Sequence, residues 1–588
     1  VERRRLFDTP RSSWRDYDRE LISAGGGVYA RSQKSIPISA EVRSVLGLED
    51  DVTGLPPTDL MRAILMAEAD LLWNGGIGTY VKSESETNAD VGDKANDPIR
   101  VDGGQLRCGC VGEGGNLGFT QRGRIEYATN GGRITTDFID NSAGVDTSDH
   151  EVNIKILLDR VVAQGDMTGK QRNELLASMT DEVAEQVLVD NYEQNLALAN
   201  AEEQSDSLLH VQEEWIRRLE RQGLLNRELE FLPSRKQVAD RIERQQGLTA
   251  PELSVLLAYT KIVLADELID TDLADDPHLR NDLFAYFPAK MRQEYRQQME
   301  EHPLRREIIV TQIVNALVNG AGITYFHRLT SETAASAAEV TRANFLAREI
   351  FGSGALLEEI GSYDNQIDAA VQTRMRLETR TLVERASRWL VNNRRPPLDS
   401  DSIVDSFEIS SQQVMQALPE LLTGRELDTF ERRRDALTSR GVPMELATKV
   451  AGLPPAYAIL GVVETARRDE VDPLEVARVH FTIGEQLGLP AMVSQILALP
   501  RQDRWQTMAR AALRDELHGV HAQLTAQVLA KTSADQPAPA RVADWEKADE
   551  VVVTRAVDTL DEICAESRAD LARLSVGLRV VRSLLATP

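Results

Sequence analysis

The sequence predicts an α/β unit over residues 1–158, followed by a large all-α region over residues 159–588. The distribution of glycine changes at this boundary, because 20 of the 37 glycines lie within the first 158 residues. The spacing of apolar residues changes there too, from short runs ending in glycine-rich turns to the i, i+3, i+4 pattern of amphipathic helices. Short strands that alternate with helices indicate βαβ units and therefore a parallel sheet.

Three short apolar runs in the first unit predict strands, because each is followed by a turn rich in glycine or asparagine. These runs cover residues 69–73, 106–111 and 134–139. A helical pattern covers residues 57–67, where Thr58 is the expected N-cap.

Helical periodicity begins in the second region at Leu175, Leu176 and Met179 and continues at Val187 and Leu188. Further helices are expected at residues 250–266, 305–318, 338–351, 364–392 and 425–440, with a final pair over residues 545–586.

Breaks in the helical pattern divide this second region. Proline-bearing breaks lie at residues 394–397 and 452–455, and the Ala/Pro-rich segment 533–541 predicts a loop or linker. We therefore expect two or more helical subdomains with a loop near residues 533–544. The sequence shows no repeat of fixed period, so it does not predict a solenoid.

Composition narrows the class of protein. The net charge of −26 and the pI near 4.9 argue against nucleic-acid binding, since phosphates would be repelled. Cys108, Cys110 and Cys564 are too few and too oddly spaced for a disulfide framework or a metal site. No apolar run reaches the roughly 20 residues that span a bilayer, and no signal-peptide pattern opens the chain. We expect a soluble, reduced, cytoplasmic protein with no membrane partner.

The chemically informative segment holds three loops that follow the three predicted strands. They are Asn-Gly-Gly-Ile-Gly-Thr at 74–79, Gly-Glu-Gly-Gly-Asn-Leu-Gly at 112–118 and Asp-Asn-Ser-Ala-Gly-Val-Asp-Thr-Ser at 140–148. Ligands of open α/β sheets bind at the carboxyl edge of the strands, so the loops indicate one shared ligand site. A single such loop is more often a plain tight turn, and loop 112–118 alone also fits a weak phosphate-loop pattern.

Residues 70–82, 111–121 and 138–158 resemble the large NAD-specific glutamate dehydrogenases of bacteria. The similarity extends into the helical region, including Leu-Thr-Ala-Pro-Glu-Leu-Ser at 248–254. Shorter glutamate dehydrogenases carry an E-G-A-N loop that resembles residues 113–116, with Gly115 where alanine is usual. Their N-A-G-G-V-x-x-S-x-x-E motif resembles residues 141–151.

The resemblance implies that residues 1–158 are the C-terminal part of a Rossmann-like NAD-binding domain, with a partial parallel sheet, and it assigns roles within this part. Asn116 would contact the nicotinamide ribose and Asn141 the carboxamide of NAD, while Gly75 and Gly76 would allow close backbone approach to the cofactor. Val145 and Ser148 would face the side-chain carboxylate of L-glutamate, with the Ser148 hydroxyl as a donor. Neutral side chains of this kind orient a nicotinamide ring without disturbing hydride transfer electrostatically.

Structural alternatives exist for several of these residues. Asn141 could cap a helix starting near Ser142, and Ser148 with Glu151 could form a capping box for the next helix. We interpret His150 as structural.

No other candidate suggests a catalytic or metal site. His518 and His521 share a helical face, which is more simply a solvated face than a zinc set. Lys34 is not a catalytic lysine, because the resemblance places the catalytic lysine and aspartate in a substrate domain that precedes this chain. We therefore expect no catalytic residue and no metal here.

The glycine-rich fingerprint of the dinucleotide fold and its ribose-binding acid are not found in the chain. Because the sequence starts at Val1 rather than at methionine, we expect a processed or truncated polypeptide that continues upstream. The resemblance implies oxidation of L-glutamate to 2-oxoglutarate and ammonium with NAD, in a homo-oligomer. The isolated chain should be inactive and should not bind NADH tightly. One alternative is a noncatalytic assembly or regulatory module, and a weaker one is an unrelated nucleotide-binding enzyme.

Overall fold

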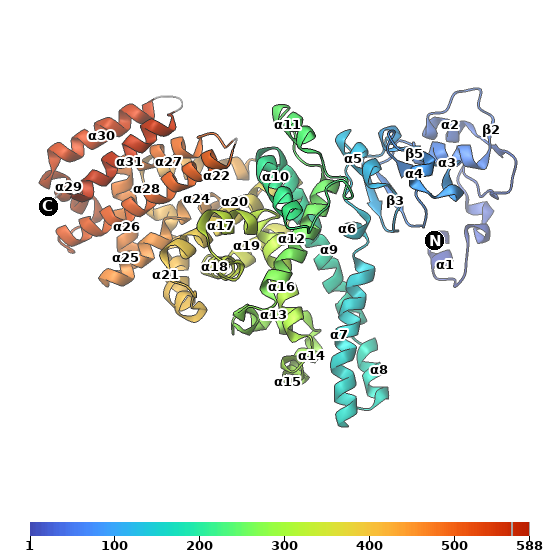
Figure 1. Cartoon of the computed structure of the whole chain (residues 1–588), viewed down its shortest axis with the longest axis horizontal. Helices are drawn as coiled ribbons and strands as arrows, with labels where there is room; N and C mark the ends of the chain where they lie inside the picture. The colour runs from blue at the N-terminus through green and yellow to red at the C-terminus, as the bar shows by residue number, and fades with distance from the viewer. Residues whose placement is uncertain (502, 566–568, 587–588) are drawn as a thin grey trace.

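The structure is a computed structural model that describes residues 1–501, 503–565 and 569–586. The molecule is elongated, with a small α/β part at one end and the C-terminal helices at the other (Figure 1). Helices account for 69% of the structure, so the chain is mostly helical.

The α/β part has short elements. They are α1 Glu2–Phe7, η1 Trp14–Asp16, η2 Arg19–Leu21, β1 Ile36–Pro37, α2 Ala40–Leu46, β2 Gly54–Leu55, α3 Pro57–Leu65, β3 Leu71–Asn74, β4 Val81–Lys82, α4 Asn88–Val91, η3 Lys94–Asn96, β5 Val101–Asp102, η4 Gly103–Gln105, β6 Cys110–Glu113, α5 Gln121–Thr129 and α6 Asp137–Asp140.

Two small parallel pairs form the β structure near the predicted loops. β3 pairs with β6 in the register Leu71↔Cys110 to Asn74↔Glu113, and β4 pairs with β5. The pair β1–β2 is antiparallel. A small core beneath them includes Val81, Val111 and Phe119. The predicted parallel pairing is confirmed, but the strands are few and short.

The third predicted strand, residues 134–139, is wrong. Only an isolated bridge joins Arg133 to Cys110, and the chain then turns into α6. The turn into α6 is favoured over a strand because two carboxylates of α6 accept hydrogen bonds from the backbone of loop 112–118. The Leu117 N–H donates to Asp137 at 2.8 Å, and the Glu113 N–H donates to Asp140 at 2.9 Å.

Two further details of the predicted α/β unit differ. The strand expected at residues 106–111 starts only at Cys110, after the turn η4. Thr58 does not cap α3, because the helix begins at Pro57, whose ring suits the first helical position.

The helical part comprises the remaining elements. They are α7 Ala143–Gln164, α8 Gly169–Ala177, α9 Thr180–Glu203, α10 Ser205–Arg221, α11 Arg235–Glu243, α12 Ala250–Leu268, η5 Asp272–Asp275, α13 Arg280–Tyr286, α14 Ala289–Glu294, α15 Arg296–Glu300, α16 Arg305–Ala321, α17 Tyr325–Thr333, α18 Ala337–Ile350, α19 Ser353–Gly361, α20 Ala369–Asn393, α21 Ser400–Leu421, α22 Gly424–Thr438, α23 Met444–Ala451, α24 Leu453–Ala456, α25 Ile459–Asp469, α26 Pro473–Gln486, α27 Leu489–Leu497, α28 Arg504–Lys531, α29 Ala538–Ala548, α30 Glu550–Ala565, α31 Leu571–Ser583 and η6 Leu584–Ala586.

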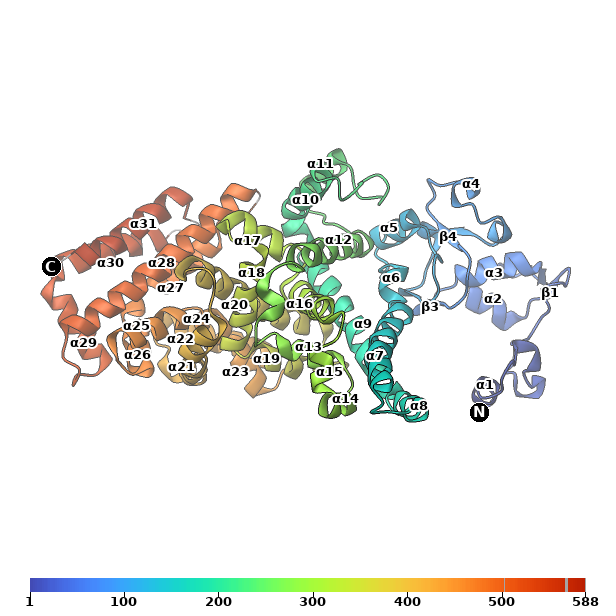
Figure 2. The ribbon, with the colours of Figure 1, turned by 60° about the horizontal axis from the view of Figure 1, so that its bottom comes forward.

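Two apolar cores hold these helices together. A middle core is built around Trp215, Leu264 and Phe326, and a C-terminal core around Phe407 and Leu524. The helices predicted within residues 250–440 are confirmed, with bounds shifted by a few residues except at the start of α20. α7 and α8 project away from the body as a long pair (Figures 1 and 2).

The predicted breaks have mixed outcomes. Residues 394–399 form a break as expected, but the break at residues 452–455 is mostly the short helix α24. The loop expected at residues 533–541 ends earlier, because α29 begins at Ala538 with proline in its first turn. The final helical segment of residues 545–586 holds the end of α29, then α30 and α31, while residues 566–568 lie outside the described part.

In the described ranges, no single helix is long and apolar enough to cross a membrane. Two bent helix pairs are together long and apolar enough for a span, by length and composition alone. They are α16 with α17 and α23 with the segment Leu453–Asp469.

Candidate functional site

The carboxyl ends of β3 and β6 lie side by side, because the two strands pair in parallel with Asn74 opposite Glu113. Loops 74–79 and 112–118 therefore leave the sheet together. The Gly115 N–H donates to the Asn74 carbonyl oxygen at 2.9 Å, which ties one loop to the other. This edge is where the sequence placed the ligand site.

The glycines of loop 112–118 allow close packing against loop 74–79. A Cβ on Gly114 would lie 2.4 Å from the Trp73 ring, and a Cβ on Gly115 would lie 2.5 Å from the Gly76 carbonyl oxygen. Gly115, where the shorter glutamate dehydrogenases have alanine, is thus explained by the neighbouring loop.

Replacing Gly115 with alanine is expected to destabilise this edge by about 1–3 kcal/mol, since the added methyl would push Gly76 away. Native-state hydrogen exchange of peptides covering β3 and β6 measures that local free energy. Gly76→Ala is the matched control, because a Cβ there meets nothing within 4 Å and its effect should stay within about 0.5 kcal/mol. Equal effects of the two substitutions would contradict the packing argument.

The third loop reaches the same place from α6. The Asn141 amide nitrogen donates to the Asn116 side-chain oxygen at 2.8 Å, so these two predicted cofactor residues touch. Asn141 is half-buried, whereas Asn116, Gly75 and Gly76 are exposed. The structure thus brings together the four residues predicted for the cofactor.

The two predicted substrate residues lie in the first turns of α7. Val145 is 76% exposed, and Ser148 is also exposed. The Ser148 hydroxyl donates to the Val145 carbonyl oxygen at 2.6 Å, which leaves its oxygen available as an acceptor and its proton able to switch partner. Both side chains therefore lie on the solvent face of the helix beside Asn141.

The capping alternatives for these residues are wrong. Asn141 follows the end of α6, and α7 begins after Ser142 without a side-chain cap. Ser148 and Glu151 lie inside α7, so there is no separate helix for them to cap.

A buried ionic network supports the three loops, and sequence reasoning missed it. Glu113 is fully buried and accepts two hydrogen bonds from Arg124, at 2.6 and 2.9 Å. Arg124 also pairs with Asp137 at 3.2 Å, and Asp140 accepts from the Glu113 N–H. Burial raises the pKa of the Glu113 carboxyl, and its contacts with Arg124 oppose that shift.

A second cluster lies on the other face of α7. Ligand atoms of Asp146, His150 and Asp190 lie within 4.8 Å of one another. Burial, followed by the charge of Asp190, raises the pKa of Asp146 to about 7. Burial lowers the pKa of Lys261 to about 8, against the attraction of Asp190. The i, i+4 spacing of Asp146 and His150 was visible in the sequence, but α9 brings Asp190 only through tertiary packing.

The histidines singled out in the sequence are packed among other rings. His150 is buried and stacks on Tyr286 with ring centroids 4.3 Å apart, in keeping with a structural role. The prediction that His518 and His521 lie on a solvated helical face is wrong. His521 is buried and stacks on His480 at 3.5 Å, and His518 meets Tyr457 edge to face.

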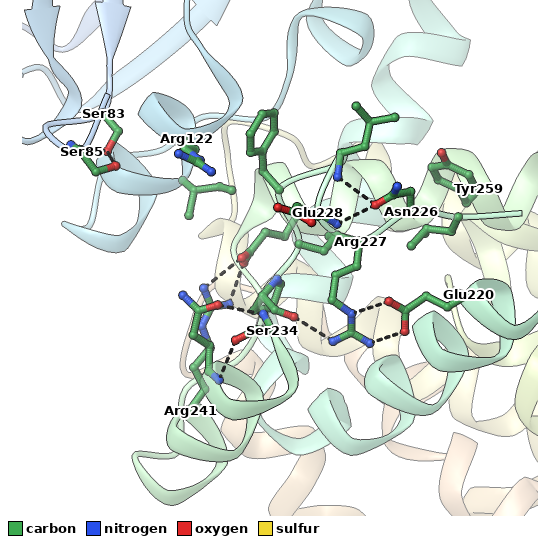
Figure 3. A pocket seen from close by; sticks show the side chains of 18 of the residues that line it. Ser83, Ser85, Arg122, Glu220, Asn226, Arg227, Glu228, Ser234, Arg241 and Tyr259 are labelled. Carbon is green, nitrogen blue, oxygen red and sulfur yellow. Dashed lines mark hydrogen bonds and ion pairs between the residues drawn. The ribbon is translucent and has the colours of Figure 1, made fainter. Parts of the chain in front are cut away.

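A cavity of about 1200 Å³ separates the α/β part from α10 and α11 (Figure 3). None of the six predicted site residues, all of them described, lines this cavity. The guanidiniums of buried Arg227 and half-buried Arg241 are already paired, Arg227 with Glu213 and Glu220 and Arg241 with Glu252. The cavity therefore offers no unpaired positive charge at these arginines and lies apart from the loop site.

Comparison with known proteins assigns the family. The family "Glutamate dehydrogenase, C-terminal" matches residues 245–583, and "Bacterial NAD-glutamate dehydrogenase, catalytic domain" matches residues 1–201.

Curated relatives give the same result. The chain is 44% identical to an NAD-specific glutamate dehydrogenase of Halomonas elongata, over 98% of this chain and 36% of that protein. Identity is 43% over the whole chain with the Mycobacterium tuberculosis protein of that name, and 44% over 99% with the Pseudomonas aeruginosa one. The chain spans about a third of the length of these relatives, 36% in each case. The chain therefore belongs to the family of the bacterial NAD-specific glutamate dehydrogenases.

Proposed function

We propose that this protein takes part in the NAD-dependent oxidative deamination of L-glutamate to 2-oxoglutarate and ammonium. The observation that carries the proposal is the contact between Asn116 and Asn141 at the carboxyl edge of β3 and β6. The relatives' shared name, NAD-specific glutamate dehydrogenase, supports the choice of cofactor and substrate.

The residues at this edge fit a nicotinamide group. Asn116 and Asn141 offer neutral donors and acceptors suited to a ribose hydroxyl and a carboxamide. Exposed Gly75 and Gly76 carry no side chain that would keep a ligand from the backbone. When bound, NAD would accept the hydride from the substrate Cα.

The substrate would lie between this edge and the start of α7. Ser148 would donate to the side-chain carboxylate of glutamate, and Val145 would contact its methylene groups. Loss of the Cα hydride leaves an iminium that water hydrolyses to 2-oxoglutarate and ammonium. The side chains of this edge bind and orient the reactants, and we assign no proton transfer to them.

Ser148→Ala tests this role through the choice of substrate. The substitution is made in the protein isolated from its natural cells. We expect kcat/KM for L-glutamate to fall about tenfold, as expected for the loss of one charge-assisted hydrogen bond. L-norvaline has a methyl group where glutamate has its side-chain carboxylate, so its kcat/KM should not change.

Thr147→Ala is the matched control, since Thr147 is a neighbouring exposed hydroxyl on α7. NADH formation with each substrate is the readout. Equal losses for glutamate and norvaline would show that Ser148 does not contact the carboxylate. A protein that forms no NADH from glutamate would contradict the proposed activity itself.

We further propose that residues 1–158 contribute to a Rossmann-like NAD-binding domain and that residues 159–588 serve assembly or regulation in a cytoplasmic homo-oligomer. Assembly would cover exposed apolar side chains of the helical part, such as Ile409 and Val551. Light scattering after size exclusion tests it, and a monomer at micromolar concentration would contradict it.

A further inference from the structure

Seven arginines and two carboxylates line a cavity of about 130 Å³ where α10, α17, α20 and α28 meet. The cavity, here called the arginine cavity, lies among helices of the middle and C-terminal cores and apart from the loop site. This excess of positive charge contrasts with the whole chain, whose net charge is −26. This excess of positive charge favours an anion as the ligand of the cavity.

Three of these arginines are held by carboxylates. The pairs are Arg328–Glu384, Arg388–Glu332 and Arg514–Asp515. The first pair is bidentate, with nitrogen–oxygen distances of 2.7 and 2.6 Å. These pairs consume both carboxylates that line the arginine cavity.

The other arginines have no such partner. Across the described residues, Arg380 and Arg385 form no ion pair, and Arg510 contacts only the Leu497 carbonyl oxygen, at 3.3 Å. Burial lowers the pKa of Arg380 to about 10, against the attraction of Glu384 and together with the repulsion of Arg328. Burial lowers the pKa of Arg385 to about 10 as well. Both stay protonated at neutral pH, so like charges face one another here.

Buried donors also lack partners in this place. Neither the His210 Nε2 atom nor the Arg328 Nε atom, both buried, has a hydrogen-bond partner within the described structure. Burial lowers the pKa of His210, so its ring is neutral at neutral pH and can donate or accept. Buried polar groups are rarely left unsatisfied, and these point to a missing bonded group.

We propose that the arginine cavity binds a small oxyanion with two or more negative charges, of the phosphate or dicarboxylate class. Planar guanidinium groups bond well to the oxygens of both classes. A volume of about 130 Å³ equals about four water molecules at roughly 30 Å³ each, which suits one phosphate or a short dicarboxylate. A neutral or cationic ligand would leave Arg380 and Arg385 without a bonded anion, since Glu384 attracts both but its ion pair is with Arg328.

Binding should also stabilise the chain. The cavity is lined from α10 and α17 of the middle core and from α28 of the C-terminal core. An anion bound to both sides would oppose the repulsion between arginines, and a ligand that binds only the folded state raises its stability.

Calorimetric titration of the 588-residue chain with inorganic phosphate and, separately, with succinate tests the proposal at constant ionic strength. We expect saturable binding of at least one probe, weakened about tenfold or more by Arg385→Gln, since a charge-assisted bond is lost. Binding of phosphate alone, or of succinate alone, would assign the class. Arg374→Gln is the matched control, because Arg374 is exposed on the same helix.

Melting of the same variants gives a second readout. Without added anion, Arg385→Gln should melt at a higher temperature than the unaltered chain, because it relieves repulsion, and its anion-dependent rise should shrink. Arg510→Gln is expected to show the same changes in melting temperature and anion binding. It replaces Arg385→Gln in the test if that variant fails to fold. The proposal is overturned if neither probe binds saturably, or if binding and the rise persist in both arginine variants. Phosphate that binds at the proposed cofactor site instead would also remain bound in both arginine variants, so that case counts against the arginine cavity.

Discussion

Replacing Arg124 with leucine is expected to lower the local free energy of unfolding by about 3–5 kcal/mol, one of the largest losses available to a single substitution. The reason is Glu113, which is fully buried and would keep its charge without its bidentate partner. Hydrogen exchange of peptides covering residues 110–124 measures the loss.

The loss in Arg124→Leu should depend on pH. Burial already raises the folded-state pKa of Glu113, and loss of Arg124 removes the contacts that oppose this shift, so protonation stabilises the fold of the variant. The variant should therefore recover stability as pH falls through that folded-state pKa, and it should be weakest at neutral pH. Adding Glu113→Gln should restore part of the stability at neutral pH, because the buried charge is gone. An Arg124→Leu protein as stable as the unaltered chain would contradict the structural role of the pair.

Replacing Asn141 with alanine is expected to lower kcat/KM for L-glutamate about 10²-fold, because a misplaced nicotinamide can cost that much. The change removes the amide that holds Asn116 at 2.8 Å as well as the proposed carboxamide contact. Stability should change little, since Asn141 is only half-buried. NADH formation by the protein as it occurs in its cells is the measurement.

Asn130→Ala is the matched control, because Asn130 is an exposed asparagine at the end of α5. Its activity should equal that of the unaltered protein. Asn116→Ala should resemble Asn141→Ala, and the double variant should lose less than the two losses combined, since the residues act as a pair. An Asn141→Ala protein with unaltered kcat/KM would remove this residue from the site.

Long helices were the most predictable part of the fold. α16 and α18 carry an apolar period over several turns, so their existence and approximate bounds follow from the sequence. Residues 134–139 show the limit of that reasoning. Their apolar run fits a strand, yet the carboxylates of Asp137 and Asp140 bond to a neighbouring loop and turn the chain into α6. Such tertiary contacts override local preference.

The site was predictable in part. Loops 74–79 and 112–118 meet because parallel strands end at one edge, which the sequence pattern indicates. The Glu113–Arg124 pair was not foreseen, since charged residues in a sequence usually indicate solvated positions. Only the packing of α5 against the sheet shows that Glu113 is buried. The arginine cavity was hidden for the same reason, because its arginines come from several helices.

The central claim is that loop 112–118 and Asn141 hold the nicotinamide end of NAD rather than its phosphates. The most direct test compares the affinities of NADH and of ADP-ribose, which lacks nicotinamide, for the unaltered and Asn141→Ala forms of the protein used for the kcat/KM measurements rather than of the isolated chain. We predict that NADH binding weakens about tenfold, as expected for one lost hydrogen bond, while ADP-ribose binding stays the same. Equal weakening of both ligands would place the phosphates at this loop and contradict the account.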